Sequence, residues 1–267
     1  MGGGEFEEYR RVITRIAGEA AGLLRDLACE EKYVEVVSGE TMRADIESES
    51  YIIDALKAEG LGGRVVTEER GVVELGRAGP TFIVDPLDGS TNYKACIPWS
   101  SVSIAVVPEG SRRLRDVAAG VVAPVFYGPY ISFTRGGGCY EGASRVRPRE
   151  RPLEVVYVYV EHPEAAEGLA RLTRGLGGLK VRSLGSAALE MAYTALGRGL
   201  LFLDLRSRLR NVDIAAALGI TIECGGEAVN YNGDPLDSGV DSVKRVGTVI
   251  SSLRPGILKE ALSILRG

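Results

Sequence analysis

Histidine and cysteine are scarce in this 267-residue chain, and their scarcity limits the chemistry that it can perform. The one histidine, His162, precedes a proline and has no serine or aspartate partner at a recognisable spacing, so we interpret it as structural. The four cysteines lie far apart and form no CxxC pair: Cys29, Cys96, Cys139 and Cys224. This spacing excludes the usual kind of zinc site and predicts free, mostly buried thiols.

The chain also lacks an excess of positive charge, a long apolar run and a leader-like beginning. Its net charge is −4, whereas nucleic-acid binding normally requires a basic face. No run of about 18 apolar residues, the length that spans a bilayer, is present. Residues 1–7 lack the features of a signal peptide and the hydroxyl residue that favours N-myristoylation. We therefore expect a cytoplasmic protein that binds neither nucleic acid nor membranes.

The composition is that of an ordinary globular protein, with 45% hydrophobic and 25% charged residues. A chain of this length buries enough surface to fold without a metal or a disulfide. A required metal would therefore serve chemistry rather than folding. Arginine greatly outnumbers lysine, which is a weak indication of a thermophilic source.

The first half has helical and strand patterns in separate blocks. Apolar residues at helical spacing predict two long helices, over residues 6–27 and 44–58. Apolar and β-branched runs predict strands at residues 64–67, 81–84, 102–107 and 117–125. Three glycines at 136–138 predict a turn between two further strands. This half is therefore predicted to be α+β.

In the second half, strand and helix patterns alternate. Strands are predicted at residues 155–160, 180–182, 200–205 and 246–251, and helices at 163–174, 187–196, 213–224 and 256–265. Alternation of this kind is typical of α/β structure. The polar, proline-bearing segment 147–152 is the best candidate for a boundary, which predicts domains at residues 1–150 and 151–267.

The chemistry is concentrated in the octapeptide Asp85–Asn92 (DPLDGSTN), directly after a predicted apolar strand. Its two carboxylates repel each other if held close together, and one stays protonated unless a cation lies between them. Hard oxygen ligands suit Mg²⁺, Mn²⁺ or Ca²⁺ rather than zinc or copper. Gly89 permits a tight turn, and the amides of Gly89, Ser90 and Thr91 would point outward at a helix start, where phosphate binds well.

A simpler interpretation of this segment is a turn in which Asp88 or Ser90 caps a helix. A bare pair of aspartates would favour that interpretation, but the complete octapeptide behind a strand favours a metal and phosphate site. The octapeptide resembles the signature of the inositol monophosphatase superfamily. Those metal-dependent, lithium-sensitive phosphatases include fructose-1,6-bisphosphatases and nucleotide phosphatases.

Further segments resemble the same family in the same order, from about residue 38 to 252. Residues 67–69 (TEE) resemble its acidic pair, whose first member is a metal ligand and is Glu68 here. Residues 213–217 (DIAAA) resemble its second signature, whose leading aspartate binds metal and is Asp213 here. Two departures are Val212, where tryptophan is usual, and residues 251–253 near the last strand, where small residues and an asparagine are usual. The basic segment 204–210 (DLRSRLR) resembles the archaeal members, which are similar to dual inositol-phosphate and fructose-bisphosphate phosphatases.

The resemblance implies a layered α/β/α/β/α sandwich with an active site between its two halves, and two or three Mg²⁺ ions per site. Glu68, Asp85 and the Leu87 carbonyl would hold one ion, and Asp85, Asp88 and Asp213 a second; a third, weaker ion would bind Glu68. Mn²⁺ is the alternative metal. Two such ions, about 3.5–4 Å apart, can stabilise the attacking and leaving oxygens of an in-line displacement.

The resemblance also implies roles in catalysis and substrate binding. Glu68 would help to orient the attacking water, and Ser90, paired with Asp45, would accept or relay its proton. No covalent phosphoenzyme is needed. The residues expected to contact the substrate are Asp88, Gly89, Ser90, Gly185, Ser186, Ala187, Arg206 and Arg182. The two arginines are assigned from their charge and position rather than from the resemblance: most such charges are simply solvated, and the functional interpretation is that Arg206 neutralises a substrate phosphate or completes a neighbouring subunit's pocket.

The sequence therefore predicts a Mg²⁺-dependent phosphatase, and a homodimer, acting on myo-inositol 1-phosphate, fructose 1,6-bisphosphate or both. A phosphatase of nucleotides such as 3′-phosphoadenosine 5′-phosphate is the enzymatic alternative. A metal-binding relative that has lost turnover is the alternative from a different class.

Overall fold

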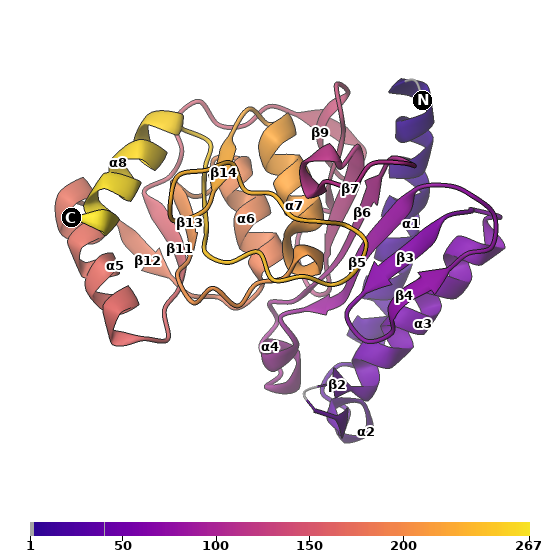
Figure 1. Ribbon diagram of the computed structural model, residues 1–267. Coiled ribbons are helices and arrows are strands. Elements are labelled where there is room, and N and C mark those ends of the chain that lie inside the picture. Colours follow the sequence, from indigo (N-terminus) through magenta and orange to yellow (C-terminus); the bar gives the residue numbers. More distant parts are fainter. Residues whose placement is uncertain (1–2, 40) are drawn as a thin grey trace.

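The computed structural model describes residues 3–39 and 41–267, which form five alternating layers of helix and sheet (Figure 1). The outer helices α1 (Gly3–Leu27) and α3 (Arg43–Ala58) cover one face of a large sheet. A middle pair of helices separates it from a smaller sheet: α6 (Ala187–Ala195) and α7 (Asn211–Glu223). The opposite outer layer consists of α5 (Pro163–Leu176) and α8 (Pro255–Arg266). The predicted α/β/α/β/α sandwich is thus confirmed.

The large sheet has eight strands. In spatial order these are β10 (Ser144–Val146), β9 (Gly138–Glu141), β8 (Ile131–Thr134), β7 (Ala119–Pro124), β6 (Ser101–Val107), β5 (Thr81–Asp88), β3 (Arg64–Thr67) and β4 (Gly71–Glu74). All neighbours are antiparallel except β3 and β5, which run parallel, with Thr67 beside Val84. The chain therefore leaves both strands at the same edge of the sheet.

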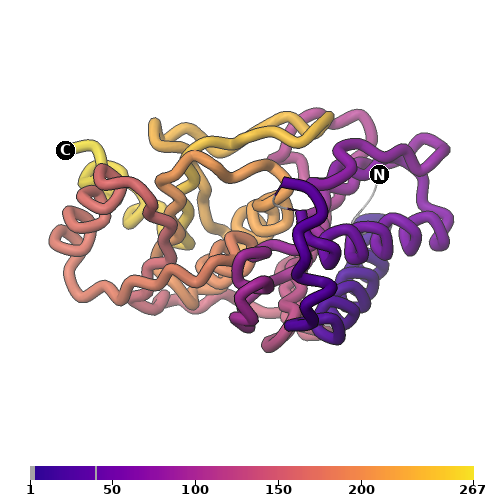
Figure 2. Tube along the Cα trace, turned by 90° about the horizontal axis from the view of Figure 1, so that it is seen from below, coloured from indigo at the N-terminus to yellow at the C-terminus, as the bar shows by residue number. Residues whose placement is uncertain are grey.

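The small sheet has five strands. Their order is β12 (Lys180–Arg182), β11 (Val155–Tyr159), β13 (Leu201–Asp204), β15 (Val249–Ser252) and β14 (Glu227–Val229). The first three are parallel, as expected for strands joined through α5 and α6, and the last two are antiparallel to their neighbours. Both views show the start of α1 and the end of α8 on opposite sides of the molecule (Figures 1 and 2).

Helix α7 is buried along almost its whole length between the two sheets. Its packing against the large sheet depends on Gly219, because a Cβ there would lie 2.0 Å from the Phe133 ring. A helix that is apolar all round belongs in the core. The tight fit fixes the first turn of α7, which carries Asp213, against the edge of the large sheet.

The helices of the middle layer connect the two predicted domains. The chain passes from the large sheet to the small one between β10 and β11, across the predicted boundary at residues 147–152. However, α6 and α7 belong to the second half and pack against both sheets, in one apolar cluster with residues of the first half. The division at residue 150 therefore stays a prediction.

All the helices and strands predicted from periodicity are present, with ends shifted by a few residues. The sequence did not indicate seven short elements: α2 (Glu31–Val34), β1 (Val36–Ser38), β2 (Thr41–Met42), η1 (Leu114–Asp116), β4, β10 and β14. Each of these seven has only two to four residues, so its periodicity gives little signal. Within the described residues, no helix is both long and apolar enough to cross a membrane.

The prediction of four free thiols is wrong. Cys29 is bonded to Cys96, with Cα atoms 5.5 Å apart, and Cys139 to Cys224, with Cα atoms 6.2 Å apart. The first bond ties the end of α1 to the chain just after the short helix α4 (Ser90–Lys94), and the second ties β9 to the end of α7. The partners are 67 and 85 residues apart, so only the folded chain brings them together.

We expect both disulfides to stabilise the protein measurably. Loops of 67 and 85 residues correspond to about 4 kcal/mol each in the chain-entropy account. Reduction should therefore lower Tm, by on the order of 10 °C per bond. Calorimetry with and without a phosphine reductant measures this, and a variant with all four cysteines replaced by serine is the control that should not respond. Four titratable thiols in the native protein before reduction would contradict the assignment.

Candidate active site

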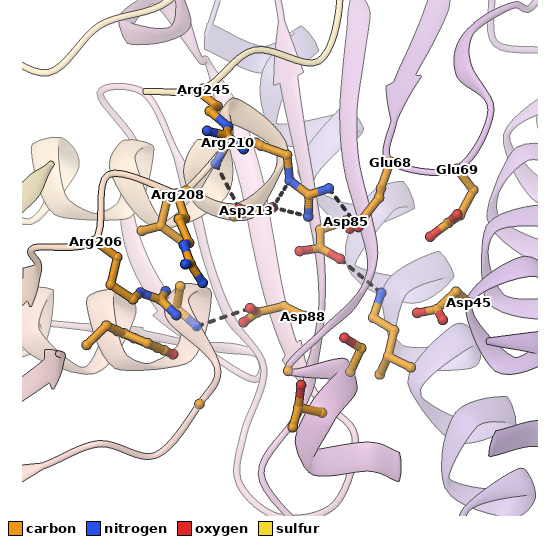
Figure 3. A pocket seen from close by; sticks show the side chains of 18 of the residues that line it. Asp45, Glu68, Glu69, Asp85, Asp88, Arg206, Arg208, Arg210, Asp213 and Arg245 are labelled. Atoms are coloured by element: carbon orange, nitrogen blue, oxygen red, sulfur yellow. Dashed lines mark hydrogen bonds and ion pairs between the residues drawn. The ribbon is translucent and has the colours of Figure 1, made fainter. Parts of the chain in front are cut away.

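A cavity of about 650 Å³ opens where the loops after β3 and β5 face the first turn of α7 (Figure 3). Its walls come from both halves of the chain. The acidic residues that line it are Asp45, Glu68, Glu69, Asp85, Asp88, Glu161 and Asp213. Four arginines also line it, all from the second half: Arg206, Arg208, Arg210 and Arg245.

Asp85 and Asp88 reach the same cavity because strand β5 contains a bulge. Side chains three positions apart on a regular strand point to opposite faces. The pairing with β6 shifts by one residue between Asp85, opposite Ser103, and Asp88, opposite Ser101. An extra residue in one strand re-aims the side chains that follow it. Both carboxylates line the cavity, although Asp85 is 3% and Asp88 7% exposed.

The two aspartates have different partners. Oδ1 of Asp85 accepts a hydrogen bond from the backbone N–H of Leu87 at 3.1 Å, which fixes the turn. Asp88 accepts bonds from the backbone N–H groups of Ala187 at 3.1 Å and Ala188 at 3.0 Å, and from the Ser186 hydroxyl. Asp88 therefore also caps α6, the helix-capping role that the sequence offered as the simpler interpretation, here for a helix of the second half.

Glu68 follows β3 directly, and a buried glutamate of α3 shapes the turn that carries it. Oε1 of Glu49 accepts hydrogen bonds from the Thr67 hydroxyl at 2.8 Å and the Glu69 and Arg70 backbone N–H groups at 3.2 Å. Its other oxygen pairs with Nε of Arg70 at 3.0 Å. Because Glu49 is fully buried, this turn is held rigidly below the cavity.

Asp213 lies in the first turn of α7, where the helix dipole favours a negative charge. Its Oδ2 accepts a hydrogen bond from the backbone N–H of Arg210 at 2.8 Å. The Arg210 guanidinium donates to the other oxygen, from Nε at 3.2 Å and from Nη2 at 3.0 Å. The same guanidinium pairs with Oε1 of Glu68 at 2.7 Å.

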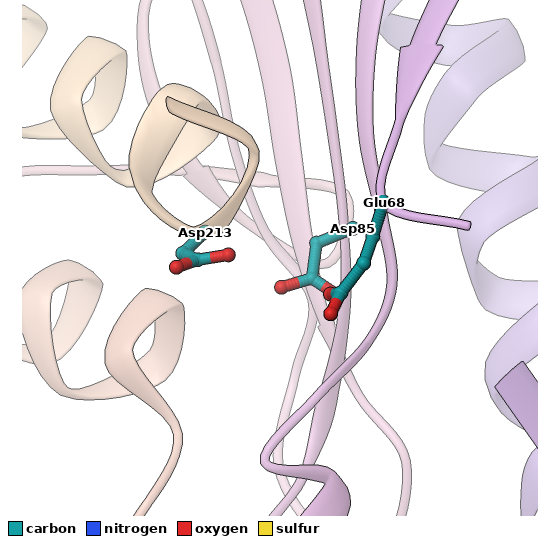
Figure 4. A group of neighbouring side chains, drawn as sticks. All are labelled: Glu68, Asp85 and Asp213. Carbon is teal, nitrogen blue, oxygen red and sulfur yellow. The ribbon is translucent and has the colours of Figure 1, made fainter. Parts of the chain in front are cut away.

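Carboxylate oxygens of Glu68, Asp85 and Asp213 lie within 4.8 Å of one another (Figure 4). Burial, and after it the charges of Asp88 and Glu68, raise the pKa of Asp85 well above its usual range. Burial also raises the pKa of Asp213, against the opposing effect of Arg210. Such a cluster is stable in ionised form only if positive charge enters it. An all-oxygen donor set of this kind fits Mg²⁺ or Mn²⁺.

Comparison with known proteins agrees with this geometry. The sequence model described as "Inositol monophosphatase family" matches residues 5–263. The chain is 48% identical over 263 residues to an inositol-1-monophosphatase of Aeropyrum pernix, with 97% of each chain covered. It is 28% identical over 260 residues to a fructose-1,6-bisphosphatase/inositol-1-monophosphatase of Methanothermobacter thermautotrophicus, covering 92% of this chain and 88% of that protein.

A solved structure is similar as well. This structure is of a Pyrococcus horikoshii protein described as having similarities to inositol-1 monophosphatase. Its TM-score with this chain is 0.78 at 26% sequence identity, and the match covers 97% of this chain and 98% of that chain. The chain belongs to the inositol monophosphatase family. It is a phosphatase, and its archaeal relatives fit the thermophilic source that the arginine excess indicated.

Two residues assigned from the family resemblance lie at the cavity without the expected contact. Asp45 and Ser90 both line it, but in the described structure Asp45 accepts a hydrogen bond from the Met42 backbone N–H at 2.7 Å rather than from Ser90. Burial raises the pKa of Asp45 to about 7. The nearby Thr41 hydroxyl donates to Glu69.

The expected substrate contacts divide into two groups. Asp88, Gly89, Ser90, Gly185, Ala187 and Arg206 line the cavity, as does the expected ligand Leu87. Ser186 is fully buried behind the wall, where it bonds to Asp88. Arg182 lies exposed on β12, bonded to the carbonyl of Val181, and is not among the residues that line the cavity. His162 is an exposed residue at the start of α5 and is not among the residues that line the cavity.

The sequence did not single out two glutamates that support this phosphatase site, Glu49 and Glu190. Glu49 stands at helical spacing with the buried Ile52, Ile53 and Leu56, so its place on a buried face was available as a signal. Glu190 is fully buried in α6, and its Oε1 accepts a hydrogen bond from the Leu184 backbone N–H at 2.7 Å, next to Gly185.

Glu190 should make the stability of the metal-free protein depend on pH. Burial raises its pKa from 4.5 to about 8. A carboxyl group whose pKa is higher in the folded state contributes stability that is complete below its unfolded pKa and is lost as pH rises through the folded value. Tm should therefore fall between about pH 5 and about pH 8. Asp45 and Asp88, with pKa values raised to about 7 and about 6, act in the same direction.

Glu190→Gln should reduce this fall, because glutamine resembles the protonated acid. Melting curves in chelator across the pH range measure it, with Glu164→Gln on the exposed face of α5 as the matched control. Equal pH slopes in wild type and Glu190→Gln would show that Glu190 does not titrate in this range.

Proposed function

We propose that this phosphatase hydrolyses small sugar and inositol phosphates in a Mg²⁺-dependent reaction, with myo-inositol 1-phosphate and fructose 1,6-bisphosphate as the leading substrates. The observation that carries the proposal is the convergence of Glu68, Asp85 and Asp213 from three separate elements within 4.8 Å. The adjoining cavity of about 650 Å³ has room for a sugar phosphate. The names of the relatives support this substrate class.

Two or three Mg²⁺ ions per site are proposed, held by Glu68, Asp85, Asp88, Asp213 and the Leu87 carbonyl. When bound, they would neutralise the phosphate and activate a water for in-line attack. The carboxylates themselves fix the position of that positive charge, because they come from the ends of β3 and β5 and from α7, which are packed rigidly together.

The chain's own groups would orient the phosphate and move the proton. Gly89 has φ of 86°, and a Cβ at this position would meet the Gly185 carbonyl at 2.9 Å, so only glycine allows the two substrate-facing segments to approach so closely. The amides of Gly89 and Ser90 would then stabilise charge on the phosphoryl oxygens. Ser90, which lines the same cavity as Asp45, would accept or relay the proton of the water.

Direct attack by water, without a covalent phosphoenzyme intermediate, is consistent with the positions of the cysteines and of His162. The cysteines are paired in disulfides, and His162 is not among the residues that line the cavity.

Arg206 is the best placed arginine for a substrate phosphate or ring, because Asp204 and Glu161 hold its guanidinium, each at 2.9 Å. A 3′-phosphoadenosine 5′-phosphate-type substrate remains the alternative, and a relative without turnover is disfavoured because every acidic ligand is present.

We also propose that the protein is cytoplasmic and forms a homodimer. Disulfides are rare in most cytosolic proteins but common inside hyperthermophilic archaea, so the two bonds are compatible with that location. Sedimentation at micromolar concentration tests the dimer.

A substrate panel tests the function directly. Purified protein should release phosphate from inositol 1-phosphate or fructose 1,6-bisphosphate when Mg²⁺ is present and release almost none in chelator. Release from the nucleotide alone would favour the alternative enzyme. No metal-dependent release from any of the three would support a non-catalytic relative.

Asp85→Asn should lower kcat/KM by about 100-fold or more, because the central ligand loses its charge. The amide oxygen can keep the bond to the Leu87 backbone N–H, and loss of repulsion should leave the metal-free Tm unchanged or raise it. Stopped-time phosphate assays and melting curves measure both quantities. Asp54→Asn, with a side chain 78% exposed on α3, is the matched control. Near-normal turnover of Asp85→Asn would remove it from the proposed ligand set.

A further inference from the structure

The Arg210 guanidinium occupies part of the space around which the metal-ligating carboxylates gather. It joins Glu68, from the loop after β3, to Asp213, from the first turn of α7, through the contacts at 2.7, 3.0 and 3.2 Å described above. Figure 3 shows the guanidinium lying between these two side chains and above Asp85. The arginine thus supplies positive charge at the place where a divalent cation would supply it.

Two other arginines of the cavity, Arg206 and Arg208, are engaged differently. Arg206 is held by Asp204 and Glu161, and its guanidinium lies over the Tyr159 ring, 4.1 Å from the centroid. Arg208 pairs with Glu161 at 2.6 Å. Neither Arg206 nor Arg208 contacts an expected metal ligand. Arg210 therefore differs from these two arginines in its partners and not in its charge.

Arg210 can release these carboxylates without disturbing the fold. Its backbone is fixed, because its N–H donates to Asp213 Oδ2 and it forms an isolated β-bridge with Arg245. Its side chain is 33% exposed and borders the cavity, so rotation of the side chain alone would carry the guanidinium into open space. Both Glu68 and Asp213 would then have oxygens free for a cation.

We propose that Arg210 is a tethered cation that holds Glu68 and Asp213 together in the metal-free protein and competes with the divalent metal for them. Metal binding displaces its guanidinium into the cavity, toward the space that the substrate enters. This inference rests on the proposed metal site. It explains how carboxylates from opposite halves of the molecule remain close together when no metal is bound, and it makes Arg210 a positioning residue that sets metal affinity.

Titration of the protein with MgCl₂ in an isothermal calorimeter measures its Mg²⁺ affinity and tests the inference without substrate. Charge-assisted hydrogen bonds of this kind oppose metal entry, so Arg210→Gln should bind Mg²⁺ about tenfold more tightly than wild type. Arg208→Gln removes the same charge from the same cavity but leaves the ligands untouched, and should change the affinity by less than about threefold. Arg210→Lys, which keeps the charge but cannot span both carboxylates, should lie between.

A second readout is thermal. In chelator, Arg210→Gln should melt below Arg208→Gln because its carboxylates repel without compensation, and Mg²⁺ should raise its Tm by more than it raises that of wild type. Equal Mg²⁺ affinities of Arg210→Gln and Arg208→Gln, or weaker binding by Arg210→Gln, would overturn the competition. Absence of Mg²⁺ binding by the wild type would overturn the proposed metal site itself, which distinguishes that failure from the failure of this inference.

Discussion

Repulsion among buried carboxylates is the constraint around which this molecule is organised. Asp85, Asp88 and Asp213 are each less than 10% exposed, and with Glu68 they face one cavity. Burial alone would drive them to protonate, as the raised pKa values of the three aspartates indicate. Only positive charge at their centre allows them to remain ionised together. A phosphatase needs positive charge at the same place, to neutralise its substrate.

The fold brings these groups together through three local features of the chain. β3 and β5 are parallel neighbours with Thr67 beside Val84, so the next residues, Glu68 and Asp85, emerge side by side at one edge of the sheet. The bulge in β5 turns Asp88 to the same side. The close fit of α7 at Gly219 places Asp213 against that edge. Regular secondary structure thus fixes the three aspartates, and Glu49 supports the turn that carries Glu68.

The sequence predicted the helices, the strands and the paired aspartates Asp85 and Asp88 because these are recorded locally, whereas the layered arrangement and the roles of Glu68 and Asp213 came from the family resemblance. Periodicity revealed the long helices and strands, and the octapeptide Asp85–Asn92 carries its ligands within one segment. Contacts between residues that are far apart in the sequence leave no such local pattern. The pairing of Cys29 with Cys96, the support of the Glu68 turn by Glu49, and the capping of α6 by Asp88 depend on chain crossings that spacing does not reveal. Arg210 was assigned no role, because one arginine in the basic segment 204–210 resembles any other until the fold shows its partners.

The account depends most on a divalent cation lying among Glu68, Asp85 and Asp213. A crystal structure of the protein soaked in Mn²⁺, with anomalous data collected for manganese, tests this most directly. We expect anomalous density between the three carboxylates, with the Arg210 guanidinium turned away from Glu68 and Asp213. Carboxylates that stay paired with Arg210 at saturating Mn²⁺, with no anomalous density between them, would contradict the account.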